Sequence, residues 1–119
     1  MTLTLGMITV DTTDALSLAR WWADQLDGTI EQENDGWYVT VGLPGLAQKI
    51  SFQKVSDPSP GKNRLHLDLG APELEAETDR LISAGAALLE RHEMPGGFRW
   101  NVLTDPDGNQ FCVSDTHPA

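Results

Sequence analysis

Short stretches in which apolar and polar residues alternate recur along this chain, and such alternation is typical of strands with one buried face. Residues 3–10 show it first and are rich in β-branched side chains. Further strands are predicted at 29–33, 36–42 and 48–55. Between the first two strands the apolar residues instead recur at helical spacing, at Ala15, Ala19, Trp22, Ala23 and Leu26. This part of the chain therefore predicts a strand, a helix and three strands.

Local signals set the ends of these elements. Thr13 or Asp14 can cap the helix, and Gly28 stands where a helix commonly ends. Turn residues at 34–36 and 43–45 separate the three strands that follow. Trp21 and Trp22 lie in the helix stripe, and we expect them to pack in the core.

The second half of the chain predicts the same order of elements. Leu65, Leu67 and Leu69 alternate with Arg64, His66 and Asp68, so the three polar side chains should share the face opposite the leucines. A helix should begin at Pro72 and end at Gly85, with a buried stripe of Leu74, Thr78, Leu81 and Ile82. Strands follow at 87–91, 98–104 and 110–114, the last two joined by the turn residues 105–108.

The two halves also match at a fixed offset. Met7 and His66 are 59 residues apart, and so are Gln53 and Cys112. Because both pairs fall on equivalent predicted strands, we expect the four side chains to converge on one site. Residues 56–61 contain two prolines and no periodicity, which indicates a linker. The sequence predicts one α+β domain over 1–119, made of two βαβββ modules at 1–55 and 62–115.

Composition narrows the class of partner. The chain has 119 residues, 39% of them hydrophobic, which suffices for one domain with a core. Its formal net charge of −10 disfavours nucleic acid and anionic membranes as partners. Cys112 is the single cysteine, and the start of the sequence has neither a signal peptide pattern nor a membrane span. We therefore expect a cytoplasmic protein.

The most specific sequence features lie in the second half. They are the segment Gly97–Val113, which contains the Asp105-Pro106-Asp107-Gly108-Asn109 turn, and the segment Arg64–Leu69. Together with the internal repeat, these segments resemble the vicinal oxygen chelate superfamily, which includes glyoxalase I, extradiol dioxygenases and bleomycin-resistance proteins, and in particular small bacterial glyoxalase-like domain proteins. The resemblance implies two modules whose mixed sheets curl around a central cavity, with helices on the outer face, and a homodimer.

In metal-using members of the superfamily, the resemblance places ligands at positions that read Met7, Gln53, His66 and Cys112 here. Only His66 and Gln53 carry the nitrogen or oxygen donors that Ni²⁺, Zn²⁺, Mn²⁺ or Fe²⁺ would need in such a site. We therefore expect no cofactor, with a divalent metal on His66 and Gln53 as the alternative. A set of Cys, His and Met could also hold a soft ion such as Cu(I).

The cavity that the resemblance implies would be lined by Met7, Gln53, His66, Trp100 and Cys112, with Arg99 and Trp37 as further ligand contacts. Alternation allows either Phe98 and Trp100 or Arg99 and Asn101 to face inward, and the sequence leaves both sets open. His66 is interpreted either as a ligand-binding or catalytic residue or as a structural histidine bonded to Asp68. His92 and His117 are expected to be solvated.

Three functions remain open on this basis. The first is metal-independent binding of a small organic molecule, as bleomycin-resistance proteins trap a cationic drug. The second is an enzyme, either a metal-dependent lyase, isomerase or dioxygenase, or a metal-free catalyst with His66 as general base. The third is a non-catalytic interaction module, in which side chains would fill the cavity.

Overall fold

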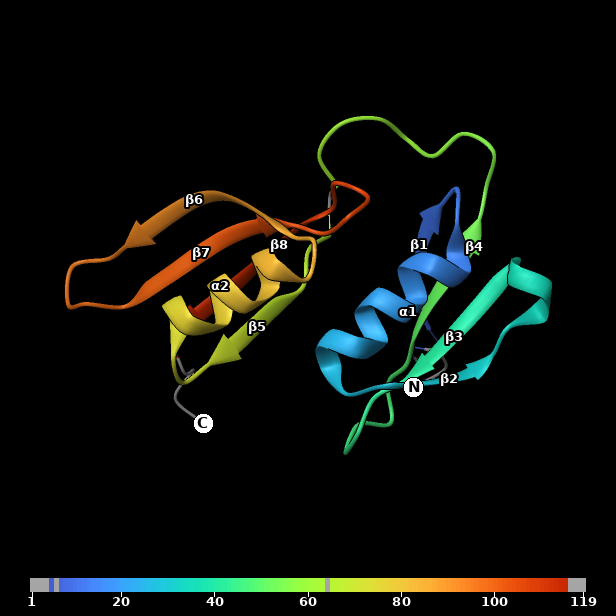
Figure 1. Ribbon diagram of the computed structural model, residues 1–119, viewed down its shortest axis with the longest axis horizontal. Helices are drawn as coiled ribbons and strands as arrows, with labels where there is room; N and C mark the ends of the chain where they lie inside the picture. The colour runs from blue at the N-terminus through green and yellow to red at the C-terminus, as the bar shows by residue number, and fades with distance from the viewer. Residues whose placement is uncertain (1–4, 6, 64, 116–119) are drawn as a thin grey trace. The chain divides into compact units, whose positions relative to one another are not determined.

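The computed structural model describes residue 5, residues 7–63 and residues 65–115. The chain divides into two compact units, unit 1 (Met1–Pro60) and unit 2 (Gly61–Ala119), and the division falls at the predicted linker. Unit 1 contains β1 (Ile8–Thr12), α1 (Ala15–Leu26), β2 (Thr29–Gln32), the short 3₁₀ helix η1 (Asn34–Gly36), β3 (Tyr38–Gly42) and β4 (Ile50–Lys54) (Figure 1). Unit 2 contains β5 (Asp68–Ala71), α2 (Leu74–Ser83), β6 (Ala87–Glu93), β7 (Arg99–Thr104) and β8 (Gln110–Asp115).

Each unit folds into a four-stranded mixed sheet. The strand order is β1-β4-β3-β2 in unit 1 and β5-β8-β7-β6 in unit 2. The first strand of each unit pairs parallel with the last, and the remaining pairs are antiparallel. The predicted α+β class and the repeated βαβββ order are therefore confirmed.

In unit 1 the helix covers the sheet with apolar side chains. Asp14 caps α1 by accepting a hydrogen bond from the Ser17 amide at 3.2 Å. The helix ends at Asp27, which adopts the left-handed conformation (φ 53°) expected for Gly28. Trp22 is buried as predicted, whereas Trp21 is only half-buried. The buried residues of α1 and of the two central strands are Ala15, Leu18, Ala19, Trp22, Ala23, Val39, Val41, Ile50 and Phe52.

In unit 2 the helix has a narrower apolar stripe. Leu74, Thr78 and Leu81 are buried as predicted, but Ile82 is 42% exposed, so its expected burial is wrong. Leu74, Thr78 and Leu81 are spaced by four and three residues and complete one stripe, and Ile82 lies about 100° further around the helix. The sheet supplies Leu103, Phe111 and Val113 to this core.

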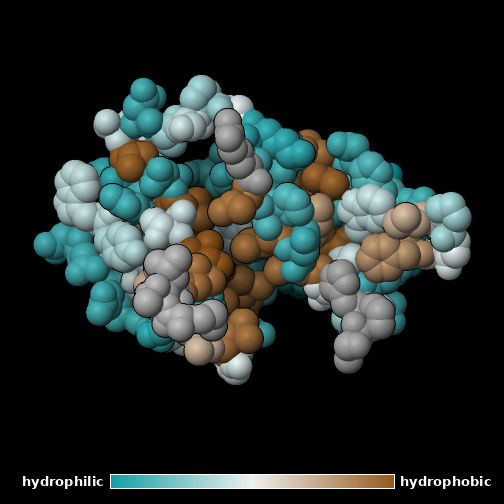
Figure 2. Space-filling model, turned by 180° about the vertical axis from the view of Figure 1, so that it is seen from behind, coloured by the Kyte–Doolittle hydropathy of each residue, from teal (hydrophilic) through white to brown (hydrophobic). Residues whose placement is uncertain are grey.

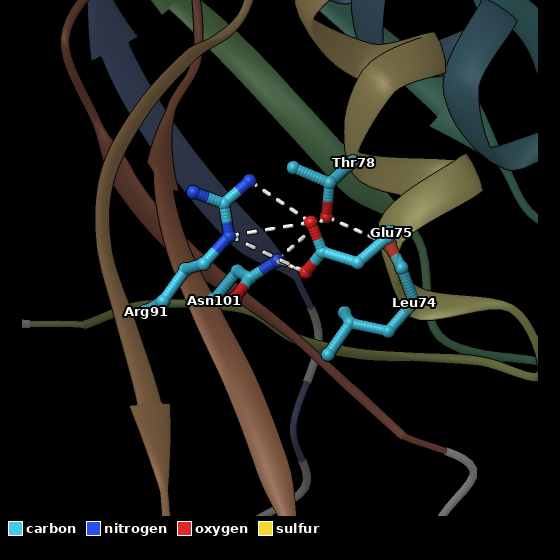
Figure 3. Close-up of polar contacts among 5 residues, drawn as sticks. All are labelled: Leu74, Glu75, Thr78, Arg91 and Asn101. Atoms are coloured by element: carbon cyan, nitrogen blue, oxygen red, sulfur yellow. Dashed lines mark hydrogen bonds and ion pairs between the residues drawn. The ribbon is translucent and has the colours of Figure 1, made fainter.

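A polar network connects α2 to the sheet (Figure 3). Asn101 on β7 is 2% exposed and donates hydrogen bonds to Thr78 Oγ1 at 2.9 Å and to Glu75 Oε2 at 3.1 Å. Thr78 in turn donates to the Leu74 carbonyl at 2.8 Å. Arg91 on β6 pairs with the Glu75 carboxylate at 2.9 Å, and the hydrogen bonds from Arg91 and Asn101 lower the pKa of Glu75. The network fixes which face of β7 lies against the helix.

The strand that opens each unit differs from the prediction. β1 runs from Ile8 to Thr12 rather than from 3 to 10, and residues 1–4 and 6 lie outside the described residues. β5 begins only at Asp68, so Leu65 precedes the strand in which its alternation placed it, and it is 82% exposed. The Asn63 side chain binds the Gln110 backbone, accepting from its amide at 2.8 Å and donating to its carbonyl at 3.1 Å. Strand pairing with β8 therefore starts only beyond this contact. Arg64 lies outside the described residues.

The strand registers depart from the 59-residue offset. In unit 2, Asp68 pairs with Cys112 across the parallel ladder. The same offset requires Thr9 to pair with Gln53, but Gln53 pairs with Asp11 and Thr9 pairs with Ser51. The two units are therefore shifted by two residues at this ladder. Because this shift is an even number of residues, matching side chains of the two units still lie on the same face of their sheets.

The turn before β8 is confirmed. Asp105 Oδ1 accepts hydrogen bonds from the amides of Asp107 at 3.0 Å and Asn109 at 2.8 Å, and Gly108 adopts a φ of 88° that favours glycine.

The two helices have 12 and 10 residues, and none in the described part of the chain has the length and apolarity of a membrane span. Figure 2 shows brown hydrophobic residues at the surface among teal hydrophilic ones; the exposed large apolar side chains include Leu5, Leu46, Leu65 and Met94.

Candidate functional site

The face of the unit 2 sheet opposite α2 gathers most of the ionisable side chains considered from the sequence. Asn101 faces α2 (Figure 3), and neighbouring residues of a strand point to opposite faces, so Trp100 and Val102 face away from the helix. Arg99 shares the face of Asn101, and its guanidinium pairs with Asp115 at 3.1 Å. Of the two alternatives that the sequence left open, Arg99 and Asn101 thus lie on the helix side of the sheet, and Trp100 lies on the opposite side. We name the surface opposite α2 the site face.

Three side chains of different chemistry meet on the site face at β5 and β8. Asp68 lies opposite Cys112 in the parallel ladder, and His66 comes two residues before Asp68. His66 Nδ1 is 3.0 Å from Asp68 Oδ1, and the ligand atoms of His66, Asp68 and Cys112 all lie within 4.8 Å of one another. The predicted partnership of His66 with Asp68 is therefore present, and it includes Cys112.

Burial and the neighbouring carboxylate disfavour ionisation of the Cys112 thiol. Desolvation is the larger cause, and the charge and hydrogen bonding of Asp68 add to it, so the pKa of the Cys112 thiol is raised. A thiol with a raised pKa is a poor nucleophile at neutral pH. Cys112 therefore lacks the lowered pKa that is typical of cysteines that form covalent intermediates.

A second group lies on the site face at β6 and β7. The imidazole of His92 stacks on the indole of Trp100, with ring centroids 4.8 Å apart and planes inclined by 15°. His92 Nε2 is 3.1 Å from Glu90 Oε2, and Phe98 adds a tilted ring 6.0 Å from Trp100. His92 is half-exposed, with 37% of its side chain accessible, so it is solvated in part while it also makes these contacts. His117, the other histidine expected to be solvated, lies outside the described residues.

Sequence reasoning missed His92 because its partners depend on strand pairing. Alternation along β6 places Glu90 and His92 on one face, which the sequence could have shown. The register that sets His92 beside Trp100, however, includes an irregularity between Leu88 and Glu90. Such a bulge shifts the pairing and is not visible in the periodicity of one strand.

A recess of about 170 Å³ connects the two groups within unit 2. Both histidines line it, together with Glu90 and Cys112. The lining also includes Lys62, Val102, Gln110 and Phe111. The volume is smaller than the ~300–1,000 Å³ of pockets that enclose drug-sized ligands, and it suits a small ligand or one part of a larger ligand.

The other predicted site residues belong to unit 1. Met7 directly precedes β1, and Gln53 lies on β4 beside Tyr38 and Asp11. Trp37 precedes β3 and is 60% exposed, with Lys54 Nζ 4.9 Å from its ring centroid. On the sheet face opposite α1, the hydroxyl of Tyr38 lies 3.3 Å from Thr9 Oγ1, and Thr40 bonds Ser51 at 3.1 Å.

The metal that the resemblance implies can be tested against these donors. Of the four expected positions, Met7 offers a thioether and Cys112 a thiol whose pKa is raised. Fe²⁺, Mn²⁺ and Ni²⁺ sites with open positions for substrate oxygens are built from nitrogen and oxygen donors. The four positions therefore do not fit such a metal ion.

Comparisons with known proteins agree with this architecture. Residues 7–114 match the family model described as "Glyoxalase-like domain". Among solved structures, the fosfomycin resistance protein FosX from Listeria monocytogenes has a TM-score of 0.77 at 14% identity, covering 98% of this chain and 96% of that chain. A comparison with curated proteins found no match.

Two further solved structures share the fold. A glyoxalase/bleomycin resistance protein/dioxygenase family enzyme from Burkholderia phytofirmans has a TM-score of 0.76 at 15% identity, covering 93% of this chain and 97% of that chain. An antibiotic binding protein from Streptomyces has a TM-score of 0.69 at 17% identity, covering 98% of this chain and 99% of that chain.

Proposed function

Because the chain belongs to the glyoxalase-like domain family, within the vicinal oxygen chelate superfamily, we propose that it binds a small planar organic cation on the site face of unit 2. The observation that carries this proposal is the stacked pair of His92 and Trp100 beside the Glu90 carboxylate. A flat aromatic surface next to a negative charge attracts planar cations through stacking, cation–π attraction and charge pairing. Binding of this kind requires no metal ion.

Charge supports a cationic ligand over an anionic one. The chain carries a formal net charge of −10, which raises the local concentration of cations near the protein. On the site face, Asp68 and Glu90 add carboxylates near the recess, where Lys62 is the cationic lining residue. This negative charge would repel an anionic ligand and weaken its binding.

The structural neighbours are compatible with binding of small organic molecules. One of them is named as an antibiotic binding protein, and another as a fosfomycin resistance protein. At 17% and 14% identity these similarities establish the fold, and the ligand class proposed for this chain is argued from its own side chains.

The proposal is tested with a fluorescent planar cation, proflavine, and a planar anion, naphthalene-2-sulfonate, added to the full chain. Proflavine should raise the unfolding temperature and gain fluorescence polarisation, whereas the anion should do neither. Metal-free bleomycin serves as a larger cationic probe. No binding of either cation, or equal binding of the anion, would contradict the proposal.

Two tryptophans give a matched pair of variants. Trp100→Ala should weaken proflavine binding about tenfold, because it removes the stacking surface. Trp37→Ala removes an exposed indole from unit 1 and should leave the affinity unchanged. Glu90→Gln should weaken binding a few-fold and reduce its salt dependence. An equal loss in Trp37→Ala and Trp100→Ala would place the binding elsewhere.

A further inference from the structure

The site face continues past the stacked pair to the tip of the β6–β7 hairpin. His92 pairs with Trp100 across the two strands. Beyond the end of β6, the Met94 amide donates to the Phe98 carbonyl at 2.8 Å, which adds one further step to the same ladder. Residues two apart along a strand share a face, so Met94 and Phe98 lie on the site face with the stacked rings. The Phe98 ring, 6.0 Å from that of Trp100, agrees with this placement.

A tight turn holds the tip. The Gly97 amide donates to the Met94 carbonyl at 2.9 Å, and Gly96 and Gly97 adopt φ values of 100° and 94° that glycine permits. The loop extends past the end of α2 (Figure 1), so the helix does not cover it. Met94 and Phe98 therefore lie next to each other at the surface, where they are 51% and 37% exposed.

The charged residues that come between these positions lie on the other face of the hairpin. Glu93 and Arg99 pair with each other in the ladder and, by alternation, share the face of Asn101. On the site face, β6 carries the Glu90 carboxylate four residues before Met94, which is about 13 Å along the strand. The site face of the hairpin thus runs from a carboxylate, over stacked rings, to apolar side chains.

This order of charge, rings and apolar side chains matches one class of ligand. On the basis of the proposed function, we infer that the ligand is an amphipathic planar cation, whose ring stacks at Trp100 and whose apolar arm lies over Met94 and Phe98. Its positive charge then points toward Glu90 and the recess. An arm that covers the two exposed side chains removes apolar surface from water, and the flexible methionine adapts to arms of different shape.

A ligand arm fits the tip better than a protein partner does. A stable protein interface buries about 800 Å² on each partner, whereas the tip offers two large apolar side chains. These side chains are also continuous with the stacked rings, through the contact of Phe98 with Trp100. A second copy of the chain is therefore an outcome for the experiment to detect, and a ligand arm is the occupant that we propose.

N-alkylpyridinium ions test the arm on the full chain, because they keep one planar cationic ring while the chain length changes. N-octylpyridinium should bind at least about tenfold more tightly than N-methylpyridinium in calorimetry, since each methylene removed from water adds up to about fourfold in affinity. Octyl sulfate carries the same arm on an anion and should bind at least about tenfold more weakly than N-octylpyridinium. Equal affinity for the methyl and octyl cations, or equal binding of octyl sulfate, would overturn the inference.

Variants locate the arm. Met94→Ser with Phe98→Ser should reduce the octyl affinity to that of the methyl cation and should leave the methyl affinity unchanged. Met94→Ser alone keeps both rings of the tip and should remove part of the gain. The matched control, Leu46→Ser with Ile82→Ser, changes two other exposed apolar residues and should keep the full gain. A gain that survives in the double tip variant, or that disappears in the control, would place the arm elsewhere and overturn the inference.

Methyl resonances locate the arm in the unaltered chain. With methionine labelled by carbon-13 at its methyl group, the Met94 resonance is identified by its absence in Met94→Ser. It should shift with N-octylpyridinium and stay in place with N-methylpyridinium. A Met94 resonance that does not respond to the octyl cation would overturn the inference. A ligand-free dimer that the double tip variant dissociates would also overturn it, because the tip would then be a subunit interface.

The outcomes separate the arm from the stacking site. If N-methylpyridinium and proflavine bind but the octyl chain adds no affinity, the arm is wrong and the proposed function stands. If the octyl gain depends on Met94 and Phe98 while Trp100→Ala leaves proflavine binding unchanged, the arm stands and the proposed stacking site is wrong.

Discussion

The two units share one topology but bury different chemistry beneath their helices. In unit 1 the central strand β3 presents Val39 to α1, and the buried residues of that helix are all hydrophobic. In unit 2 the central strand β7 presents Asn101, whose amide bonds Thr78 and Glu75 on α2. The same fold therefore tolerates a buried polar residue, provided that its hydrogen bonds are made.

The opposite faces of the sheets differ even more. In unit 1 this face carries hydroxyl groups that bond one another, from Thr9, Tyr38, Thr40 and Ser51. In unit 2 it carries ionisable groups, from His66, Asp68, Glu90, His92 and Cys112. The helix sides of the two sheets thus differ by one buried polar network, and the opposite sides differ in the kind of polar side chain that they carry.

The largest effects on stability should come from the buried phenylalanine that each unit carries on its last strand. Phe52 and Phe111 are each 1% exposed on the helix side of the last strand. Phe52→Ala and Phe111→Ala should each lower the free energy of unfolding by about 3–5 kcal/mol, because each leaves a cavity. Urea denaturation followed by circular dichroism measures both losses.

Leu46→Ala serves as the control for these variants, since Leu46 is 62% exposed and its truncation should have little effect. If one phenylalanine variant lost less than about 1 kcal/mol, the two helix–sheet cores would not be equivalent.

A smaller effect should reveal the polar contact that distinguishes unit 2. Asn101→Ala should cost about 1–3 kcal/mol in unfolding free energy, because Thr78 and Glu75 lose a buried donor. The double variant Asn101→Val with Thr78→Val replaces both partners by apolar groups and should cost less than the two single changes added together. Strictly additive losses in thermal or urea unfolding would show that the two residues do not act as one network.

Much of this fold was predictable because its signals are local. Helical spacing located both helices, and the turn chemistry of Asp105 and Gly108 located the hairpin before β8. The errors fell where distant segments decide the outcome. Leu65 fits an alternating strand by itself, but the Asn63 side chain occupies the Gln110 backbone where pairing would begin.

The candidate site was predictable in part for the same reason. Alternation placed His66 and Asp68 on one face, and Cys112 was found through the repeat. The stacking of His92 on Trp100 could not be read from the sequence, because it depends on the register between β6 and β7 across a bulge. Which of Trp100 and Arg99 faces the helix is known only from Asn101, because the hydrogen-bond partners of Asn101 lie on α2.

The smallest expected effect concerns ionisation on the hydroxyl face of unit 1. Hydrogen bonding with Ser51, and secondarily with Thr9, lowers the pKa of Tyr38, since hydroxyl donors stabilise the phenolate. Tyr38 is the only tyrosine, so the phenolate absorption in an alkaline titration reports this residue alone. The midpoint should lie below the ordinary value of about 10. Ser51→Ala should move it upward, and Thr9→Val should do so to a lesser extent.

Glu90→Gln in unit 2 changes the other sheet and should leave the Tyr38 midpoint where it is. A midpoint that stays constant in Ser51→Ala would show that these hydroxyl groups do not act on the phenolate. The contrast between a hydroxyl face in unit 1 and an ionisable face in unit 2 would then rest on unit 2 alone. An upward shift in Ser51→Ala would instead show that the neighbouring hydroxyl groups of unit 1 tune the ionisation of Tyr38.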